Sequence, residues 1–305
     1  MKMETEAKKR IKIGKYQFVL WIAPMFIMMA VFCYYPVGHA VYASFTDWNG
    51  TTSHFIGLQN YAEMFRDVIF WRGMRNVLIL IVSGLVIGNV APIALAMLLF
   101  NLRYRRVMAA FRFFFILPML VPGIVSMMIW TKMIFNPAWN GLANSVLQVF
   151  GLKKPLGFYF VANQALWSLI LTGFPWVAGT SFLIYLAGFN NIPVSVLEAS
   201  RLDGAGAARR FFKIELPYLV GQIKYFVILG IIGGMQGFGM QLMVTKGGPM
   251  YATMVPGYSI YLEAFGGMSR YGYACCLGML IFVITLIITV INNRFIKTTE
   301  DLTNG

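Results

Sequence analysis

A polar stretch of the chain, residues 192–217, carries the side chains best suited to ionic and hydrogen-bonded contacts. It reads IPVSVLEASRLDGAGAARRFFKIELP and holds three of the eleven acidic residues and four of the basic ones. Long apolar runs precede and follow it. Because ionisable side chains are costly inside a bilayer, a stretch this polar between two apolar runs has to lie in water. Its charged side chains can form ionic contacts with a partner protein or with lipid.

Local signals divide this stretch into two short helices joined by a bend. Pro193 suits the first position of a helix, and Ser195 and Glu198 have the S-x-x-E spacing of a capping box. Asp203 is a good N-cap for the second helix, and Gly204 permits backbone angles that a continuous helix excludes. The sequence therefore predicts a helical elbow, the name used below for residues 192–217.

The second half of the elbow has an amphipathic pattern. Ala207, Phe211 and Ile214 recur at helical spacing, the basic residues among them face elsewhere, and Pro217 ends the pattern. One interpretation is a knob that seats in a groove of another protein. The other is a helix lying on the bilayer surface, with its arginines on anionic lipid. The pattern alone leaves both interpretations open.

The composition of the whole chain is that of a polytopic membrane protein. Of the 305 residues 59% are apolar and 12% are charged, and the mean hydropathy is +0.69. The net charge of +14 does not indicate nucleic-acid binding, because the basic residues are scattered between apolar runs. The three cysteines and two histidines lack the spacing of a metal site or a redox pair.

Six apolar runs are long enough to cross a bilayer as helices. Pro118 and Pro122 interrupt the third run, and Gly173 and Pro175 interrupt the fourth, so we expect kinked or broken helices there. The sequence thus predicts an all-α membrane protein with an N-terminal segment, a six-helix membrane domain that contains the elbow, and a tail. These parts are expected at 1–16, 17–292 and 293–305, with the six spans at about 17–38, 77–100, 113–135, 165–187, 225–244 and 272–291.

The fifth run contains pairs of glycines at helical spacing. Gly230 and Gly234 form one small-xxx-small pair, and Gly233 and Gly237 form another. Such pairs let two helix backbones approach closely. We expect helix packing at these positions, with pore lining as the alternative.

Basic residues are distributed unequally between the two sides of this arrangement. With the N-terminus in the cytoplasm, 17 of the 25 basic residues lie on the cytoplasmic side and 8 on the other side. Since the cytoplasmic loops of membrane proteins carry the excess of Lys and Arg, we expect both termini and the elbow in the cytoplasm.

The elbow resembles the EAA motif of binding-protein-dependent ABC importer permeases. That motif is written EAA, three residues, G, nine residues, I-x-LP, and the spacing here matches throughout, with a serine for the second alanine as the one departure. Stretches at 44–48, 57–61, 136–137, 247–249 and 252–253 also resemble the sugar-import subfamily, in particular the subunit related to the maltose and glycerol-phosphate permeases. The matching residues of the elbow are Glu198, Ala199, Ser200, Asp203, Gly204, Ala205, Phe211, Ile214, Leu216 and Pro217.

The resemblance implies a type I ABC importer permease fold in a prokaryotic cytoplasmic membrane. It implies three kinds of protein partner: a second EAA-bearing permease subunit in a heterodimer, a cytoplasmic ATPase dimer and an extracytoplasmic solute-binding protein. It also implies that the first part of the motif, from Glu198 to Ala205, sits in a cleft of the ATPase, whose closing would push the elbow. The chain has no G-x-x-x-x-G-K-[ST] loop, so ATP and Mg are expected on the partner ATPase and no cofactor on this non-catalytic chain.

The function that follows is ATP-driven import of a sugar, in the first place an oligosaccharide, by alternating access. Import of glycerol-3-phosphate or another polar solute is the alternative. An ion-coupled secondary transporter is disfavoured, because the cores of the six spans hold no ionisable group to bind a coupling ion. A membrane-embedded enzyme is disfavoured because the spans hold no nucleophile with a base, no carboxylate pair and no metal cluster.

A sugar pathway needs aromatic faces for stacking and amide or hydroxyl groups for the sugar hydroxyls. The spans contain several such side chains, and each of them could equally serve helix packing or an interfacial aromatic belt. Whether this chain or its partner subunit contacts the solute is left open by the sequence. The candidates are Trp130, Trp176, Thr180, Ser181, Gln236, Phe238 and Gln241.

Overall fold

The described part of the protein is helical. The computed structural model describes residues 15–102, 104–177 and 179–295, so nearly all of the expected N-terminal segment and most of the expected tail lie outside the described residues. None of the described residues lies in a strand, although Thr46 and Phe55 form an isolated antiparallel bridge. The all-α class predicted from the composition is confirmed.

Short 3-10 and π-helical segments, labelled η, interrupt or extend several of the helices. In chain order the elements are α1 Lys15–Met29, η1 Ala30–Tyr34, α2 Tyr35–Ala43, α3 Gln59–Arg66, α4 Val68–Phe100, α5 Arg105–Ile116, η2 Leu117–Leu120, α6 Gly123–Met128, η3 Ile129–Ile134, α7 Leu142–Val149, η4 Phe158–Phe160, α8 Ala162–Leu171, α9 Ser181–Asn190, α10 Val194–Leu202, α11 Ala207–Arg210, η5 Phe211–Glu215, α12 Leu216–Tyr218, α13 Val220–Gln236, η6 Gln241–Thr245, α14 Pro256–Phe265 and α15 Tyr271–Phe295.

Four helical stretches are long and apolar enough to cross a membrane. They are Val19–Ala43, Val68–Phe100, Val220–Thr245 and Tyr271–Arg294, and they overlap the first, second, fifth and sixth expected spans. The third expected span is a bent pair, in which Arg106–Leu120 and Gly123–Ile134 meet at 89°. The bend lies between the two prolines that interrupt this run, as the sequence predicts.

The fourth expected span is made of two separate helices. Helices α8 and α9 each have 10 residues, and the chain between them passes through Gly173 at φ +89° and Gly179 at φ +112°. Backbone angles of this kind end a helix, and glycine adopts them at little cost. The predicted interruption at Gly173 is therefore confirmed, and it divides the run into two halves.

Helix α4 begins earlier than the expected second span, which was placed at 77–100. Its N-cap is Asp67, whose side chain accepts hydrogen bonds from the backbone N–H groups of Ile69 at 2.9 Å and Phe70 at 3.0 Å. The polar residues that follow, Arg72 and Arg75 among them, have the composition of a loop but continue the helix. The result is a helix of 33 residues.

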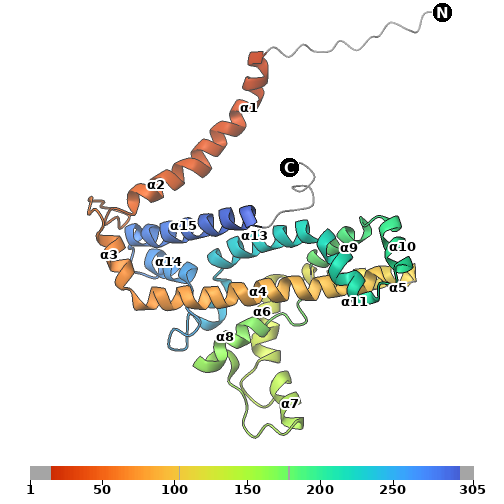
Figure 1. The fold of residues 1–305 in the computed structure, drawn as a ribbon. Coiled ribbons are helices and arrows are strands. Elements are labelled where there is room, and N and C mark those ends of the chain that lie inside the picture. The colour runs from red at the N-terminus through yellow and green to blue at the C-terminus, as the bar shows by residue number, and fades with distance from the viewer. Residues whose placement is uncertain (1–14, 103, 178, 296–305) are drawn as a thin grey trace, which may run out of the picture.

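Two buried apolar clusters lie at opposite ends of α4, which runs the length of the bundle (Figure 1). The first cluster joins the N-terminal half of α4 to α13, α14 and α15 through residues such as Phe70, Met235 and Leu277. The second joins the C-terminal half of α4 to α9 through residues such as Leu99 and Phe189. Because α4 contributes to both clusters, it connects the two ends of the molecule mechanically.

Glycines allow α13 to pack closely on α4. A Cβ atom at Gly230 would lie 2.6 Å from a methyl carbon of Leu85, and one at Gly234 would lie 2.5 Å from Ile81 Cγ1. Both distances are below van der Waals contact, so a larger residue would push the helices apart. The packing role predicted for this glycine pair is confirmed.

In the first helical stretch, α1 stands away from the remaining helices (Figure 1), whereas α2 lies against the start of α15. None of the apolar window of this stretch is buried, and Trp21 and Phe32 are 81% and 71% exposed. A helix that is apolar on all sides and uncovered is stable only in lipid or against other membrane helices. This part of the chain therefore behaves as a membrane helix without contributing to the core.

Candidate functional site

The elbow consists of two helical arms at one end of α4. The first arm is α10, which follows α9 at an angle of 70°. The second arm is α11, continued by the π-helical segment η5 and by α12, which leads into α13. The two arms joined by a bend, which the sequence predicts, are thus present.

The caps of the two arms differ from the predicted ones. Pro193 is the N-cap of α10 and not its first helical residue, and no side chain caps that end, so Ser195 and Glu198 do not form a capping box. The predicted N-cap of the second arm was also wrong. Gly206 holds that position, with an extended backbone, whereas Asp203 is the C-cap of α10.

The bend is a Schellman-type turn centred on Gly204. The N–H of Gly204 donates to the carbonyl of Arg201 at 3.1 Å, and the N–H of Ala205 donates to the carbonyl of Ser200 at 3.0 Å. Gly204 has φ +70°, a left-handed conformation that residues with a Cβ atom rarely adopt. The turn explains why the motif has glycine at this position: it satisfies the last carbonyls of α10 and reverses the chain.

The outer face of the elbow is open and carries unpaired charge. Glu198, Ala199 and Asp203 are exposed. Within the described residues neither carboxylate has an ion-pair partner. Ser200 is buried, and its hydroxyl donates to the carbonyl of Leu197 at 2.7 Å. A serine therefore replaces the alanine of the motif without leaving an unsatisfied polar atom.

A polar hollow of about 330 Å³ lies between the two arms. It combines one carboxylate with two cationic side chains, next to small and apolar residues. A hollow of this kind can accept a side chain of a docked protein, because it offers partners for either charge. The residues that line it are Ser200, Asp203, Ala205, Arg209, Lys213 and Ile214.

A buried ion pair anchors the second arm, and the sequence analysis did not anticipate it. Arg210 Nε lies 2.6 Å from Glu215 Oε1, and the Glu215 side chain is only 2% exposed. The same guanidinium donates to Asn101 Oδ1 at the end of α4, at 3.3 Å. The π-helical turn of η5 brings residues five apart together, whereas an α-helix would separate them. Opposite charges five residues apart are not a pattern that predicts an ion pair, so the sequence offered no way to find this contact.

Apolar contacts complete the attachment of the elbow. Leu197 and Phe211 pack against the cluster formed by α4 and α9, which also contains the buried residues Ile192 and Leu219. Both arms and both ends of the elbow are therefore fixed to one packed unit. Any force on the exposed face is transmitted to α4 and α9 together.

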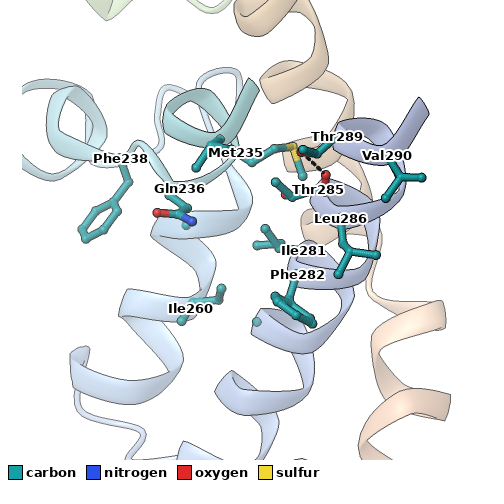
Figure 2. A pocket seen from close by; sticks show the side chains of 13 residues that line it. Met235, Gln236, Phe238, Ile260, Ile281, Phe282, Thr285, Leu286, Thr289 and Val290 are labelled. Atoms are coloured by element: carbon teal, nitrogen blue, oxygen red, sulfur yellow. Dashed lines mark hydrogen bonds between the residues drawn. The ribbon is translucent and has the colours of Figure 1, made fainter. Parts of the chain in front are cut away.

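Two of the candidate pathway residues share a cavity. Gln236 and Phe238 line a mainly apolar hollow of about 540 Å³ between α13, α14 and α15, where Thr285 and Thr289 add hydroxyl groups (Figure 2). The Phe238 ring also contacts Tyr261, with ring centroids 5.7 Å apart. This hollow combines an amide, hydroxyls and an aromatic ring, the groups that a sugar contact needs.

The structure does not gather the other pathway candidates into that cavity. Trp130 packs edge-on against Phe135 at 5.1 Å, and the indole N–H of Trp176 donates to the backbone carbonyls of Ile170 and Thr172, each at 3.2 Å. Gln241 is buried within η6. Thr180 and Ser181, at the start of α9, line none of the described hollows.

Across the described ranges, no group of three or more His, Cys, Asp or Glu side chains is placed to hold a metal ion.

The fold and the elbow define a polytopic helical membrane protein whose exposed charged elbow is attached firmly to its longest helix. Residues 88–299 match the family model described as "Binding-protein-dependent transport system inner membrane component", and the chain belongs to this family.

Individual relatives extend the comparison over nearly the whole chain. The probable ABC transporter permease protein YesP of Bacillus subtilis is 33% identical over 89% of this chain and 87% of its own length. The multiple sugar-binding transport system permease protein MsmF of Streptococcus mutans is 29% identical over 92% of this chain and 94% of its own.

A solved structure supports the fold. The bacterial alginate ABC transporter in complex with an alginate pentasaccharide-bound periplasmic protein matches with a TM-score of 0.80 and 23% identity. The match covers 93% of this chain and 96% of that one. The predicted permease fold is thereby confirmed.

Proposed function

We propose that this chain is one of two membrane subunits of an ATP-driven importer for a sugar, in the first place an oligosaccharide, in a prokaryotic cytoplasmic membrane. The family is defined by binding-protein-dependent transport. A relative that belongs to a multiple sugar system and a solved relative with an oligosaccharide-loaded periplasmic protein support the cargo. A second EAA-bearing subunit, an ATPase dimer and an extracytoplasmic binding protein complete the transporter.

One observation carries this proposal: the elbow has an exposed charged face and a firmly attached inner face. Glu198 and Asp203 are exposed and form no ion pair with another described residue, while Arg210 and Glu215 attach the elbow to the end of α4. Docking into an ATPase cleft would desolvate Glu198 and give it a basic partner, which makes the contact strong and specific. A helix resting on anionic lipid would gain nothing from exposed carboxylates.

The mechanism that follows is mechanical. Closing of the two ATPase subunits moves the elbow, and the buried ion pair and apolar contacts transfer this movement to α4 and α9 as a rigid body. The 33 residues of α4 span about 50 Å, enough to carry the movement across the membrane. Alternation between inward and outward openings results, with Gln236 and Phe238 as the proposed contacts for the passing solute.

Energy has to come from the partner ATPase. The chain has no phosphate-binding loop, so ATP and Mg are bound by the partner. The four long candidate spans of the structure and the bent pair of the third expected span contain no Asp or Glu, which an ion-coupled carrier normally needs at membrane depth. Glycerol-3-phosphate or another polar solute is the alternative cargo.

The reversal Glu198→Lys tests the docking of the elbow. In proteoliposomes that contain the complete transporter, we expect loss of the ATPase activity that the loaded binding protein stimulates, because the substituted lysine would face the basic partner. The docking contact should weaken by about 2–5 kcal/mol. Glu198→Asp, which keeps the charge, is the matched control and should retain part of the stimulation.

Two results would contradict the proposal. Normal stimulation of the ATPase in Glu198→Lys would favour an elbow that lies on the membrane surface. Uptake of sugar driven by a proton gradient in the absence of ATP would exclude an ABC importer. Thermal unfolding of both variants in detergent checks that the fold is retained.

A further inference from the structure

Three arginines cluster at the end of α4 that lies opposite the elbow. Arg66 ends α3, and Arg72 and Arg75 lie in the first turns of α4. Arg75 and Asn101 are separated by about 40 Å of helix, at 1.5 Å per residue. If the elbow is cytoplasmic, as proposed above, the arginines are extracytoplasmic. Basic residues are normally enriched on the cytoplasmic side of membrane proteins, so three arginines on the other side are an exception. This exception indicates that they have a function.

The arginines have no carboxylate partners among the described residues, because the nearby acids are engaged elsewhere. Glu63 is paired with Arg270, whose Nη2 lies 2.6 Å from Glu63 Oε2. Asp67 caps α4 and also accepts a hydrogen bond from the Tyr273 hydroxyl at 3.1 Å. The cationic face of α4 is therefore left without an internal counter-charge.

Two hollows share this face. The first, of about 380 Å³, is lined by α3 and by the start of α4 and contains all three arginines with Trp71. The second, of about 400 Å³, lies between α4, α8 and the loop at Met250, and it contains Arg72 and Arg75. Arg72 Nη1 donates to the carbonyl of Met250 at 3.0 Å, so this guanidinium is held in place while its other N–H groups stay available.

The second hollow adds the groups that recognise a sugar ring. Trp167 lines it with 61% of its surface exposed, and Asn163 contributes an amide that makes no hydrogen bond within the described residues. An exposed indole face stacks on sugar C–H groups, and a guanidinium binds an oxyanion through two parallel N–H groups. Arginine, indole and amide in one hollow are the combination that an acidic saccharide requires.

We propose that the hollow between α4 and α8 binds the anionic group of an acidic saccharide, so that the cargo of this importer carries a carboxylate, sulfonate or phosphate. The inference rests on the proposed function and names its substrate class. The volume of about 400 Å³ is that of a small-molecule site and is unlike the flat surface used for protein docking. Trp167 and Met250 at the rim of the hollow are exposed, so a solute can reach it from outside the fold, and the experiment below separates a solute from a lipid headgroup.

Binding of a defined probe tests the inference directly. The complete permease–ATPase complex is placed in phosphatidylcholine nanodiscs, and the affinity for a tetrasaccharide of galacturonic acid is measured by saturation-transfer NMR. The neutral probe is the same tetrasaccharide with its carboxyl groups reduced. We expect wild-type binding of the acidic probe that weakens with added salt, and about tenfold weaker binding of the neutral probe.

The double variant Arg72→Gln/Arg75→Gln should lose the preference for the acidic probe, at least about tenfold in affinity. Two single variants are matched controls. Arg66→Gln lies at the same end but lines only the first hollow, and Arg106→Gln lies near the elbow. Both should bind the acidic probe within about twofold of the wild type, because neither contacts the second hollow.

Several results would overturn the inference. They are equal affinity for the two probes, absence of binding, an unchanged double variant, or an Arg66→Gln effect as large as that of the double variant. Displacement of the probe by phosphatidylglycerol in the nanodisc would assign the hollow to a lipid headgroup. Weaker capture of the binding protein by the double variant, with unchanged probe affinity, would assign it to protein docking.

The proposed function and this inference can fail separately. Stimulated ATPase activity in the same preparation, combined with no preference for the acidic probe, would leave the importer standing and reject the acidic cargo. Absence of any ATP-driven sugar uptake would reject the importer, whereas the probe affinities would still report whether the hollow binds anions.

Discussion

Replacement of Arg210 tests whether a buried ion pair attaches the elbow to the membrane helices. Arg210→Met removes the guanidinium that lies 2.6 Å from the Glu215 carboxylate. The Glu215 side chain is 2% exposed and the Arg210 side chain 16% exposed, so little solvent reaches the carboxylate that is left behind. Breaking such a pair costs about 3–5 kcal/mol, and we expect about 3 kcal/mol because Arg210 is partly accessible.

A second variant separates the attraction within the pair from the penalty of a lone buried charge. Replacing both partners in Arg210→Met/Glu215→Met removes the charge as well as its partner. Apolar replacement of a buried pair is often neutral or stabilising, so the double variant should lie within about 1 kcal/mol of the wild type. It still lacks the hydrogen bond to Asn101, an interaction worth about 1 kcal/mol in typical proteins.

Reversible unfolding in mixed detergent micelles, titrated with dodecyl sulfate, gives the free energies for a double-mutant cycle. The cycle consists of Arg210→Met, Glu215→Met and the double variant. A strongly non-additive result is expected, since residues in direct contact are coupled. The reasoning would be refuted if Arg210→Met cost less than about 1 kcal/mol, or if the two single effects summed to the double effect.

Two further predictions concern the turn of the elbow and the opposite end of the molecule. Gly204→Ser should destabilise the elbow by about 1–2 kcal/mol and reduce sugar uptake, because Gly204 has φ +70°. Gly206→Ser is the matched control: Gly206 is the N-cap of α11 at φ −62°, a position that serine favours, and a Cβ atom there would meet no atom within 4 Å, so the free energy of unfolding should change by less than about 0.5 kcal/mol and uptake should be retained. Equal effects of the two variants on unfolding would contradict the assignment. Burial raises the pKa of the Glu263 carboxyl above its usual value of 4.5, more than the nearby Arg270 lowers it. Because the folded protein holds this proton more tightly than the unfolded chain, the free energy of unfolding should fall as the pH rises from 4.5 through the raised pKa. Glu263→Gln should flatten the dependence of the unfolding free energy on pH in that window. An identical pH dependence in the variant and the wild type would refute the sign of the shift.

Much of the functional site could be predicted from local sequence patterns. The elbow, its two arms, its glycine turn and its attachment between apolar runs all follow from residues within 26 positions of each other. The break in the third span at Pro118 and Pro122 and the close packing at Gly230 and Gly234 follow in the same way. Such features depend on backbone angles and side-chain size, which are properties of single residues and short spacings.

The local predictions failed where two signals competed. Asp203 has the chemistry of an N-cap, but the Gly204 turn takes up the end of α10 and leaves Asp203 as its C-cap. Likewise the polar residues after Asp67 suggest a loop, yet the cap at Asp67 starts α4 before them. In both cases a specific set of hydrogen bonds outweighs the residue preference.

What the sequence by itself determined is the membrane class, the number of apolar runs, the family of the elbow and the residues on its exposed face. Only the tertiary structure decided that Arg210 and Glu215 form a buried pair, that Gln236 and Phe238 share a cavity that the other candidates do not reach, and that Arg72 and Arg75 meet Trp167 in one hollow. The reason is that these contacts join side chains on different helices, or across a π-helical turn, and so depend on helix packing that no local spacing encodes.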